Sequence, residues 1–230
     1  MSVKNEFTKH AKDYNNNNII QQIIAKALVR EIKNNPETIL ELGCGSGQVY
    51  KNINWNIKEY DAIDFSSSMC QLHPRANNIK INCFDFDSKD FFDFLKDKHF
   101  DIVLSSSAMQ WSKDLTKLVS KLKECTDNIN AVLFTSNTFK TIQEITNSKS
   151  PILSSIEIKK AFEHSFNCEF EIYNYNLEFD DKKLMFDYIK NSGVSGGSSL
   201  SFKDAKKLYK EYTLNYLEFE VIFVKTISKS

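Results

Sequence analysis

Short apolar runs alternate with amphipathic stretches through the first 140 residues of the chain. Five runs have the length and composition of buried strands, at residues 38–42, 60–64, 79–83, 100–105 and 129–135. Apolar residues recur at helical spacing over residues 19–32, and we expect further helices near 48–53, from Ser67, and over 113–124. Strands that alternate with helices predict right-handed crossovers and a parallel sheet with helices on both faces.

The last third of the chain follows a different pattern. We expect helices at residues 155–166, 181–191 and 202–213, and strands at residues 168–179 and 217–224. A stretch rich in Gly and Ser, at residues 192–199, separates the last two helices. The whole pattern predicts an α/β protein with a doubly wound, mostly parallel sheet of seven strands. The last two helices would be inserted between the last two strands as a cap.

Composition limits the classes of partner and of metal site. The chain has 230 residues, which suits one domain, and its 30 Lys and Arg balance its 30 Asp and Glu. This balance gives no general attraction to nucleic acid or membranes. Five Cys and four His are scattered, without the spacing of a metal site or a disulfide framework. No N-terminal apolar run and no stretch of roughly 20 apolar residues is present, so we expect a cytoplasmic protein that holds no metal.

The strongest chemical signal is the turn Gly43-Cys-Gly45-Ser-Gly47, which directly follows the first strand and precedes a helix. Glycines let the backbone approach a ligand that a Cβ would exclude, and the helix that follows points N–H groups at that ligand. A dinucleotide fingerprint would have its third Gly, or an Ala, at Gln48. The spacing therefore disfavours an NAD enzyme, which remains an alternative.

Three acidic residues extend this signal. Glu41 lies at the end of the first strand, where a carboxylate can meet an ammonium group. Asp64 ends the second strand, where it can accept both hydroxyls of a ribose, and Asp85 follows the third, where it can meet an adenine amino group. Ligands of such sheets lie across the carboxyl ends of the strands. At these residues the chain resembles the class I S-adenosylmethionine-dependent methyltransferases, whose fold is Rossmann-like.

Several further segments carry a more specific resemblance. They are Phe7-Thr-Lys-His-Ala-Lys-Asp-Tyr14, Ser105-Ser-Ser-Ala-Met-Gln-Trp111, and residues 134–145, 188–194 and 216–223. Together they are similar to segments of the malonyl-acyl carrier protein O-methyltransferases of biotin synthesis. The chain departs from that family at Ser106, where Asn is usual, and at Val194, where Ala is usual. The Arg that often follows the Gly-Ala pair of the cap is also missing from this chain.

The resemblance implies methyl transfer from S-adenosylmethionine to the free carboxylate of a malonyl thioester, which starts the pimeloyl chain of biotin. A carboxylate is already ionised at neutral pH, so we expect no general base. The implied substrate-positioning residues are Tyr14, Trp111 and Lys190, with ordinary packing of the aromatic rings and a solvated Lys as alternatives. The implied cofactor contacts are Gln21, Glu41, Gly43, Gly45, Gly47, Asp64, Phe65, Met69, Asp85, Phe86, Ser105 and Gln110.

The resemblance also implies how one domain, residues 1–230, is organised. Residues 1–35 would form an N-terminal helical lid, residues 36–136 the cofactor-binding core, and residues 137–230 the substrate cap with the last strands. Acyl carrier protein is the implied partner, although coenzyme A stays open as the acyl carrier. A helical stripe of four Lys residues can attract an acidic carrier, with an ordinary solvated face as the alternative. These residues are Lys203, Lys206, Lys207 and Lys210.

We expect a monomer, with neither nucleic acid nor a membrane as a partner. Two other functions stay open. One is a methyltransferase that acts on another small-molecule acceptor, and the other is a module that binds S-adenosylmethionine without catalysis.

Overall fold

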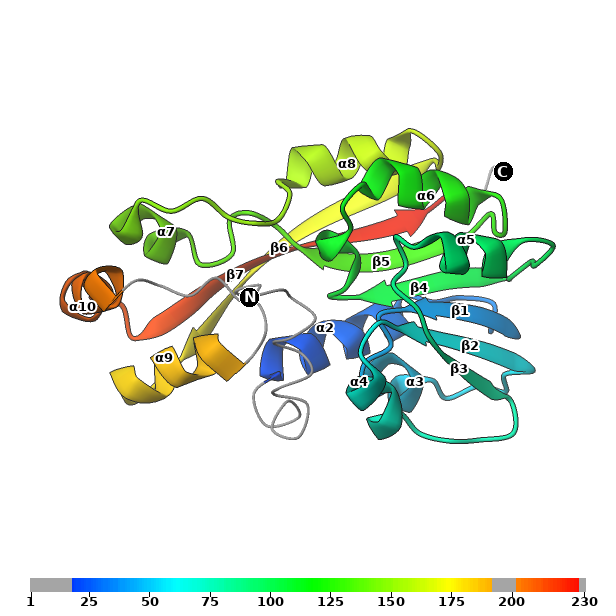
Figure 1. The fold of residues 1–230 in the computed structure, drawn as a ribbon, viewed down its shortest axis with the longest axis horizontal. Helices are drawn as coiled ribbons and strands as arrows, with labels where there is room; N and C mark the ends of the chain where they lie inside the picture. Colours follow the sequence, from blue (N-terminus) through cyan, green and yellow to red (C-terminus); the bar gives the residue numbers. More distant parts are fainter. Residues whose placement is uncertain (1–17, 192–201, 228–230) are drawn as a thin grey trace.

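The computed structural model describes residues 18–191 and 202–227, which contain one seven-stranded sheet (Figure 1). The strand order is β3-β2-β1-β4-β5-β7-β6. Strands β1 to β5 are parallel, whereas β7 is antiparallel to both β5 and β6. The strands are β1 (Thr38–Leu42), β2 (Glu59–Asp64), β3 (Ile79–Cys83), β4 (Ile102–Ser106), β5 (Ile129–Phe134), β6 (Cys168–Glu178) and β7 (Tyr216–Thr226). The predicted fold class, a doubly wound and mostly parallel sheet of seven strands, is confirmed.

The helices match the sequence pattern with two additions. The described helices are α2 (Ile19–Arg30), α3 (Gln48–Asn52), α4 (Ser67–Leu72), α5 (Lys89–Leu95), α6 (Leu115–Lys123), α7 (Lys140–Thr146), α8 (Ser155–Glu163), α9 (Lys182–Asn191) and α10 (Phe202–Glu211), with a 3-10 turn η2 (Met109–Trp111). The sequence pattern did not predict α5 or α7. Within this part of the chain, no helix has both the length and the apolar character that crossing a bilayer requires.

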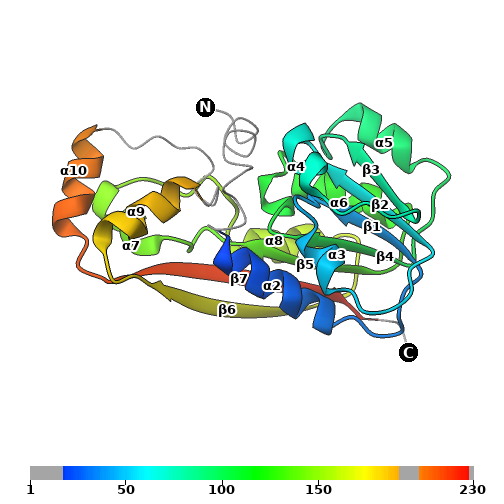
Figure 2. The same ribbon diagram turned by 90° about the horizontal axis from the view of Figure 1, so that it is seen from below.

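The central strands are buried on both faces, as crossover helices require. In β1, Ile39 joins one hydrophobic core with Ile24 and Leu28 of α2, whereas Leu40 joins a second core with Leu118 of α6. Helices α2 and α3 therefore cover one face of the sheet, and α5, α6 and α8 cover the other (Figures 1 and 2). Successive side chains of one strand therefore pack against opposite helical layers. This alternation fixes the register of the parallel strands.

Helices α9 and α10 lie between β6 and β7 in the sequence, as predicted for the cap. In space they lie at the end of the sheet where the parallel strands finish (Figure 1). Tyr188 of α9 and Tyr212, which directly follows α10, are buried in the same core as Phe219 of β7. Tyr14 and the Gly- and Ser-rich stretch lie outside the described residues, as do the side chains of Lys190 and Lys203.

Candidate functional site

The turn between β1 and α3 has a backbone conformation that its glycines permit. Gly43, Gly45 and Gly47 have φ angles of 71°, 51° and 79°, in the left-handed region where a side chain is strained. The Gly43 N–H donates to the carbonyl oxygen of Ile63, at the end of β2, over 2.7 Å. A Cβ on Gly43 would lie 2.0 Å from the Cβ of Ala108, just after β4. The turn is therefore held between the ends of β2 and β4, with no space for a side chain at Gly43.

Asp64 ends β2 with its carboxylate buried against this turn. Its Oδ2 accepts a hydrogen bond from the Gly45 N–H over 2.9 Å, and its Oδ1 accepts one from the Ser66 N–H over 2.8 Å. Burial raises the pKa of Asp64 to about 6, against the opposing effect of these two N–H donors. Each carboxylate oxygen has two lone pairs, so both oxygens can still accept a hydrogen bond from a ligand hydroxyl.

A buried polar cluster lies beneath the turn around Glu41. The Tyr60 hydroxyl donates to Glu41 Oε2 over 2.5 Å, and burial and the Glu41 charge hold the pKa of that hydroxyl well above its usual value. His73 Nδ1 lies 2.9 Å from the carbonyl oxygen of Pro74, which can only accept, so Nδ1 carries a proton. His73 Nε2 lies 3.9 Å from Glu41 Oε2. Glu41 is therefore held by neighbours from β2 and from the segment after α4.

The segment after β4 supplies two buried polar atoms beside the turn. The Gln110 side-chain amide donates to the carbonyl oxygen of Ser107 over 2.8 Å. Among the described residues, Ser107 Oγ and Gln110 Oε1 are buried without a hydrogen-bond partner. Each such group costs about 1–3 kcal/mol unless something satisfies it. These atoms therefore mark a place where a polar ligand would recover that free energy.

A cavity of about 40 Å³ opens where the turn, the end of β2 and the segment after β4 meet. Its wall is formed by Gly43, Gly45, Asp64, Phe65, Met69, Phe86, Ser106, Ser107, Ala108 and Trp111. All of these except Ser106, Ser107 and Ala108 belong to the site predicted from the sequence. Ser106 ends β4, as Asp64 ends β2, and Ser107 and Ala108 directly follow it, so strand-end position is the signal that could have found them.

Other predicted site residues lie behind or beside this wall. Gly47 packs against His73 and Pro74, where a Cβ would lie 2.5 Å from Pro74 Cδ. The Ser105 hydroxyl donates to the carbonyl oxygen of Leu42 over 3.0 Å and so joins β4 to β1. Asp85 is exposed, with its Oδ2 3.9 Å from Lys113 Nζ.

Gln21 is a buried residue of α2 and is not among the residues of this wall. Tyr14 and the side chain of Lys190 cannot be placed, because they lie outside the described parts of the chain.

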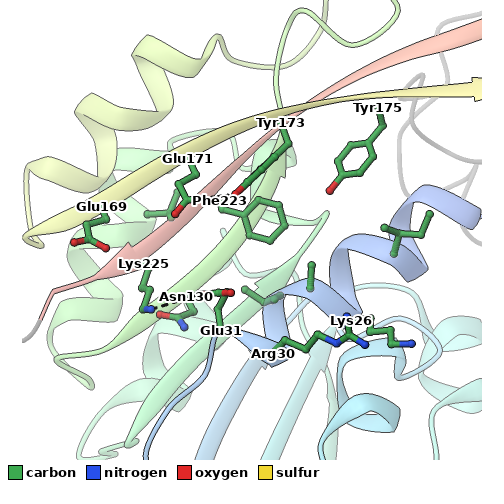
Figure 3. A pocket seen from close by; sticks show the side chains of 14 residues that line it. Lys26, Arg30, Glu31, Asn130, Glu169, Glu171, Tyr173, Tyr175, Phe223 and Lys225 are labelled. Carbon is green, nitrogen blue, oxygen red and sulfur yellow. Dashed lines mark hydrogen bonds and ion pairs between the residues drawn. The ribbon is translucent and has the colours of Figure 1, made fainter.

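A larger cavity of about 470 Å³ lies elsewhere, between α2 and the strands β6 and β7 (Figure 3). Tyr173, Tyr175 and Phe223 form its aromatic wall, and Lys26 and Arg30 of α2 lie on the opposite side. It contains none of the predicted cofactor contacts and no glycine turn. This cavity has more than ten times the volume of the smaller one, but the smaller one has the glycine turn, the strand-end carboxylate and the unsatisfied polar atoms. We therefore assign the functional site to the smaller one.

The comparison with protein families agrees with this assignment. Residues 40–132, which run from within β1 to within β5 and include the glycine turn, match the methyltransferase domain model. Among solved structures, the YcgJ protein from Bacillus subtilis is 13% identical, with a TM-score of 0.60, 92% of this chain covered and 100% of that chain. The plantazolicin methyltransferase BpumL, solved in complex with SAH, is 14% identical, with a TM-score of 0.54 and coverage of 98% and 94%.

Residues 40–132 therefore form a methyltransferase domain, and the fold of the chain is that of the class I S-adenosylmethionine-dependent methyltransferases. Among curated proteins, it is similar to the malonyl-[acyl-carrier protein] O-methyltransferase of Haemophilus influenzae, with 27% identity over 84% of this chain and 77% of that protein. It is also similar to malonyl-[acyl-carrier protein] O-methyltransferase 2 of Ilyobacter polytropus, with 25% identity over 96% of this chain and 93% of that protein.

The residues of the site fit this cofactor. S-adenosylmethionine carries a ribose with two hydroxyl donors and an ammonium group with three N–H donors, and it supplies an activated methyl group when bound. The site offers hydrogen-bond acceptors on Asp64, Ser107 and Gln110, and a backbone turn without Cβ atoms. The cavity is too small to hold the whole cofactor, and the flexible side chain of Met69 on its wall is one that can move aside.

Proposed function

We propose that the protein transfers a methyl group from S-adenosylmethionine to the free carboxylate of a malonyl thioester. The observation that carries this proposal is the similarity to curated malonyl-[acyl-carrier protein] O-methyltransferases over most of the chain. The segment Ser105-Ser-Ser-Ala-Met-Gln-Trp111 supports it, because residues of this segment form one wall of the cavity. The product would be a methyl ester, which removes the negative charge of the acyl group.

The chemistry of the cavity wall suits a carboxylate acceptor. Asp64 is the only titratable side chain among the wall residues, and two backbone N–H groups hold its carboxylate. An acceptor carbon or nitrogen that must lose a proton would need a base there, whereas a carboxylate is already ionised. The protein then has to align the acceptor with the methyl group and exclude water.

Trp111 and the cap would supply that alignment. Trp111 is half-buried on the cavity wall, where its ring can bound the space in which the acceptor lies. In this proposal Tyr14 and Lys190 hydrogen-bond the malonyl group, with Tyr14 in a lid formed by residues 1–35. Helix α9, which contains Lys190, lies at the end of the sheet where the parallel strands finish, and this position supports such a role (Figure 1).

A docking face for acyl carrier protein is part of the proposal. Lys206 and Lys210 of α10 are exposed, whereas Lys207 Nζ donates to the carbonyl oxygen of Ile145 over 2.6 Å and lies 4.0 Å from Glu211. Lys207 is therefore occupied in holding α10 to α7. The structure thus favours Lys206 and Lys210 as the contacts of an acidic carrier, with coenzyme A as the alternative carrier of the malonyl group.

The test is an assay with methyl-labelled S-adenosylmethionine and three acceptors, malonyl-acyl carrier protein, malonyl-coenzyme A and free malonate. We expect a base-labile methyl ester on the malonyl thioesters and little label on malonate. The double variant Lys206→Glu/Lys210→Glu should raise KM for the carrier protein about tenfold and leave KM for malonyl-coenzyme A unchanged. The matched control is Lys160→Glu in α8, which should change neither value.

Label on none of the malonyl acceptors, with cofactor still bound, would contradict the malonyl proposal. Such a result would favour another small-molecule acceptor. Failure to bind S-adenosylmethionine at all would be a different outcome and would contradict the cofactor site.

A further inference from the structure

Three cysteines from three different elements meet beside the cofactor site. Cys44 lies in the glycine turn, Cys70 in α4, and Cys83 at the end of β3. The sulfur of Cys70 is hydrogen-bonded by the thiols of both Cys44 and Cys83. Cys44 and Cys70 are buried, whereas Cys83 is exposed. Solvent therefore reaches the sulfur of Cys83, which is connected through Cys70 to the buried sulfur of Cys44 in the glycine turn.

Two of these sulfurs also hold the turn that follows β2. The Cys70 thiol lies 3.7 Å from the carbonyl oxygen of Asp64, and the Cys83 thiol lies 3.5 Å from the carbonyl oxygen of Phe65. The Cys70 distance suits a weak S–H···O hydrogen bond, and the single hydrogen of the Cys83 thiol can point either at the Phe65 oxygen or at the Cys70 sulfur. Asp64 and Phe65 both line the cofactor cavity, and Cys83 is the register partner of Asp64 in the sheet. The thiols therefore support the segment that presents Asp64 to the cofactor.

The sulfur cluster suits oxidation better than metal binding. Within residues 18–191 and 202–227, no group of three or more His, Cys, Asp and Glu is arranged to hold a metal ion. The hydrogen bond from Cys44, the largest cause, holds the pKa of the Cys70 thiol below its usual value. A thiol with a lowered pKa is a better nucleophile near neutral pH, because more of it is thiolate.

We propose that Cys70 and Cys83 form a reversible disulfide on exposure to hydrogen peroxide, and that this disulfide weakens the binding of S-adenosylmethionine. Peroxide reaches the exposed Cys83 sulfur, the O–O bond breaks, and a sulfenic acid and one water form. The Cys70 sulfur then attacks the Cys83 sulfur, the S–O bond breaks, and a second water leaves. Two thiols and one hydrogen peroxide thus give one disulfide and two waters.

The expected weakening of cofactor binding follows from the loss of the two thiol hydrogens. A sulfur in a disulfide has no S–H, so the carbonyl oxygens of Asp64 and Phe65 each lose a donor. A disulfide also fixes the two sulfurs about 2 Å apart, which draws α4 toward β3. Met69 lies next to Cys70 in α4 and lines the cavity, so this movement changes the wall of the site. The proposal concerns the cofactor site and does not depend on the identity of the acceptor.

The experiment measures the disulfide and the cofactor affinity separately on the full chain. Reduced protein is treated with hydrogen peroxide, digested without reductant and examined by mass spectrometry, and S-adenosylmethionine is titrated by calorimetry. We expect a peptide cross-linked through Cys70 and Cys83 and a dissociation constant raised about fivefold or more, both reversed by dithiothreitol. Bound S-adenosylmethionine should disfavour the disulfide in a glutathione buffer by the same factor, because the coupling is reciprocal.

Two variants sharpen the test. Cys83→Ser changes an exposed residue, so it should fold and bind S-adenosylmethionine, but its affinity should no longer respond to peroxide. Cys168→Ser in β6, away from the cluster, should respond like the wild type. The proposal is overturned if peroxide gives no link between Cys70 and Cys83, if Cys70 instead links to Cys44, or if the linked protein binds S-adenosylmethionine as tightly as the reduced protein.

Discussion

Asp64 is a buried carboxylate whose pKa is raised to about 6, so its proton binds more tightly in the folded chain than in the unfolded one. The raised pKa adds to the free energy of unfolding. This contribution is fully present below pH 3.8, the ordinary pKa of Asp in the unfolded chain, and is lost as the pH rises through about 6. The full shift corresponds to about 3 kcal/mol. Asp64→Asn removes this titration. The stability of the wild type relative to the variant should therefore fall by about 2 kcal/mol between pH 4.5 and pH 7.5.

Urea unfolding of both proteins at several pH values measures this difference. Every other titrating group is common to both proteins and cancels in the comparison. A difference in the free energy of unfolding that stays constant across this range would show that the pKa of Asp64 is not raised.

Individual residues of the site were predictable where a strand end fixes their place. Asp64 and the glycines of residues 43–47 follow from the pattern of strand, turn and helix, because parallel strands all end at one edge of the sheet. The contact of Tyr60 and His73 with Glu41 was not predictable, since these residues come from elements whose packing no local pattern describes. The sulfur cluster was missed for the same reason. Cys44, Cys70 and Cys83 are scattered in the sequence and meet only in the folded sheet.

At the scale of elements, the glycine turn is locked against the segment after β4. A Cβ on Gly43 would lie 2.0 Å from Ala108 Cβ, whereas the nearest atom to a Cβ on Gly45 would be the flexible end of Met69, at 3.3 Å. Both positions have positive φ, so Gly43→Ala and Gly45→Ala share the backbone strain. We expect Gly43→Ala to lower the free energy of unfolding by about 2–4 kcal/mol and Gly45→Ala by about 1 kcal/mol.

The double variant Gly43→Ala/Ala108→Gly provides the control, because it removes the clash and keeps the strain. Chemical denaturation of all three proteins measures the effect. Equal losses for the two single variants, or no recovery in the double variant, would contradict the tight packing of the turn against the segment after β4.

Long periodic elements were predicted well, whereas two short helices were not. Helix α5 has seven residues, and only Phe91 and Leu95 of its helical face are buried, which is too few to give a periodic signal. Helix α7 begins after Phe139, which has a φ of 60° that only the folded chain maintains. In each case tertiary packing, rather than local sequence, decides where the helix begins.

At the scale of the molecule, two cavities beside the sheet differ in what they offer to a ligand. The groove between α2 and strands β6 and β7 is the larger, but it has no strand-end carboxylate and no glycine turn (Figure 3). The cavity at the carboxyl ends of β1, β2 and β4 is smaller but has the polar groups that a nucleoside with an amino acid tail requires. Sequence predicted the second location, because the order of the strands places all these groups at one edge.

Titration of S-adenosylmethionine into three proteins at pH 7.5 tests this account most directly. The proteins are the wild type, Asp64→Asn, and the groove variant Tyr173→Ala, each first shown to be folded by circular dichroism. We predict one binding site in the wild type, the same affinity in Tyr173→Ala, and binding at least about tenfold weaker in Asp64→Asn, since losing a charged hydrogen-bond partner costs about 1.5–3 kcal/mol. Full affinity in Asp64→Asn together with weakened binding in Tyr173→Ala would contradict the account and place the cofactor in the groove.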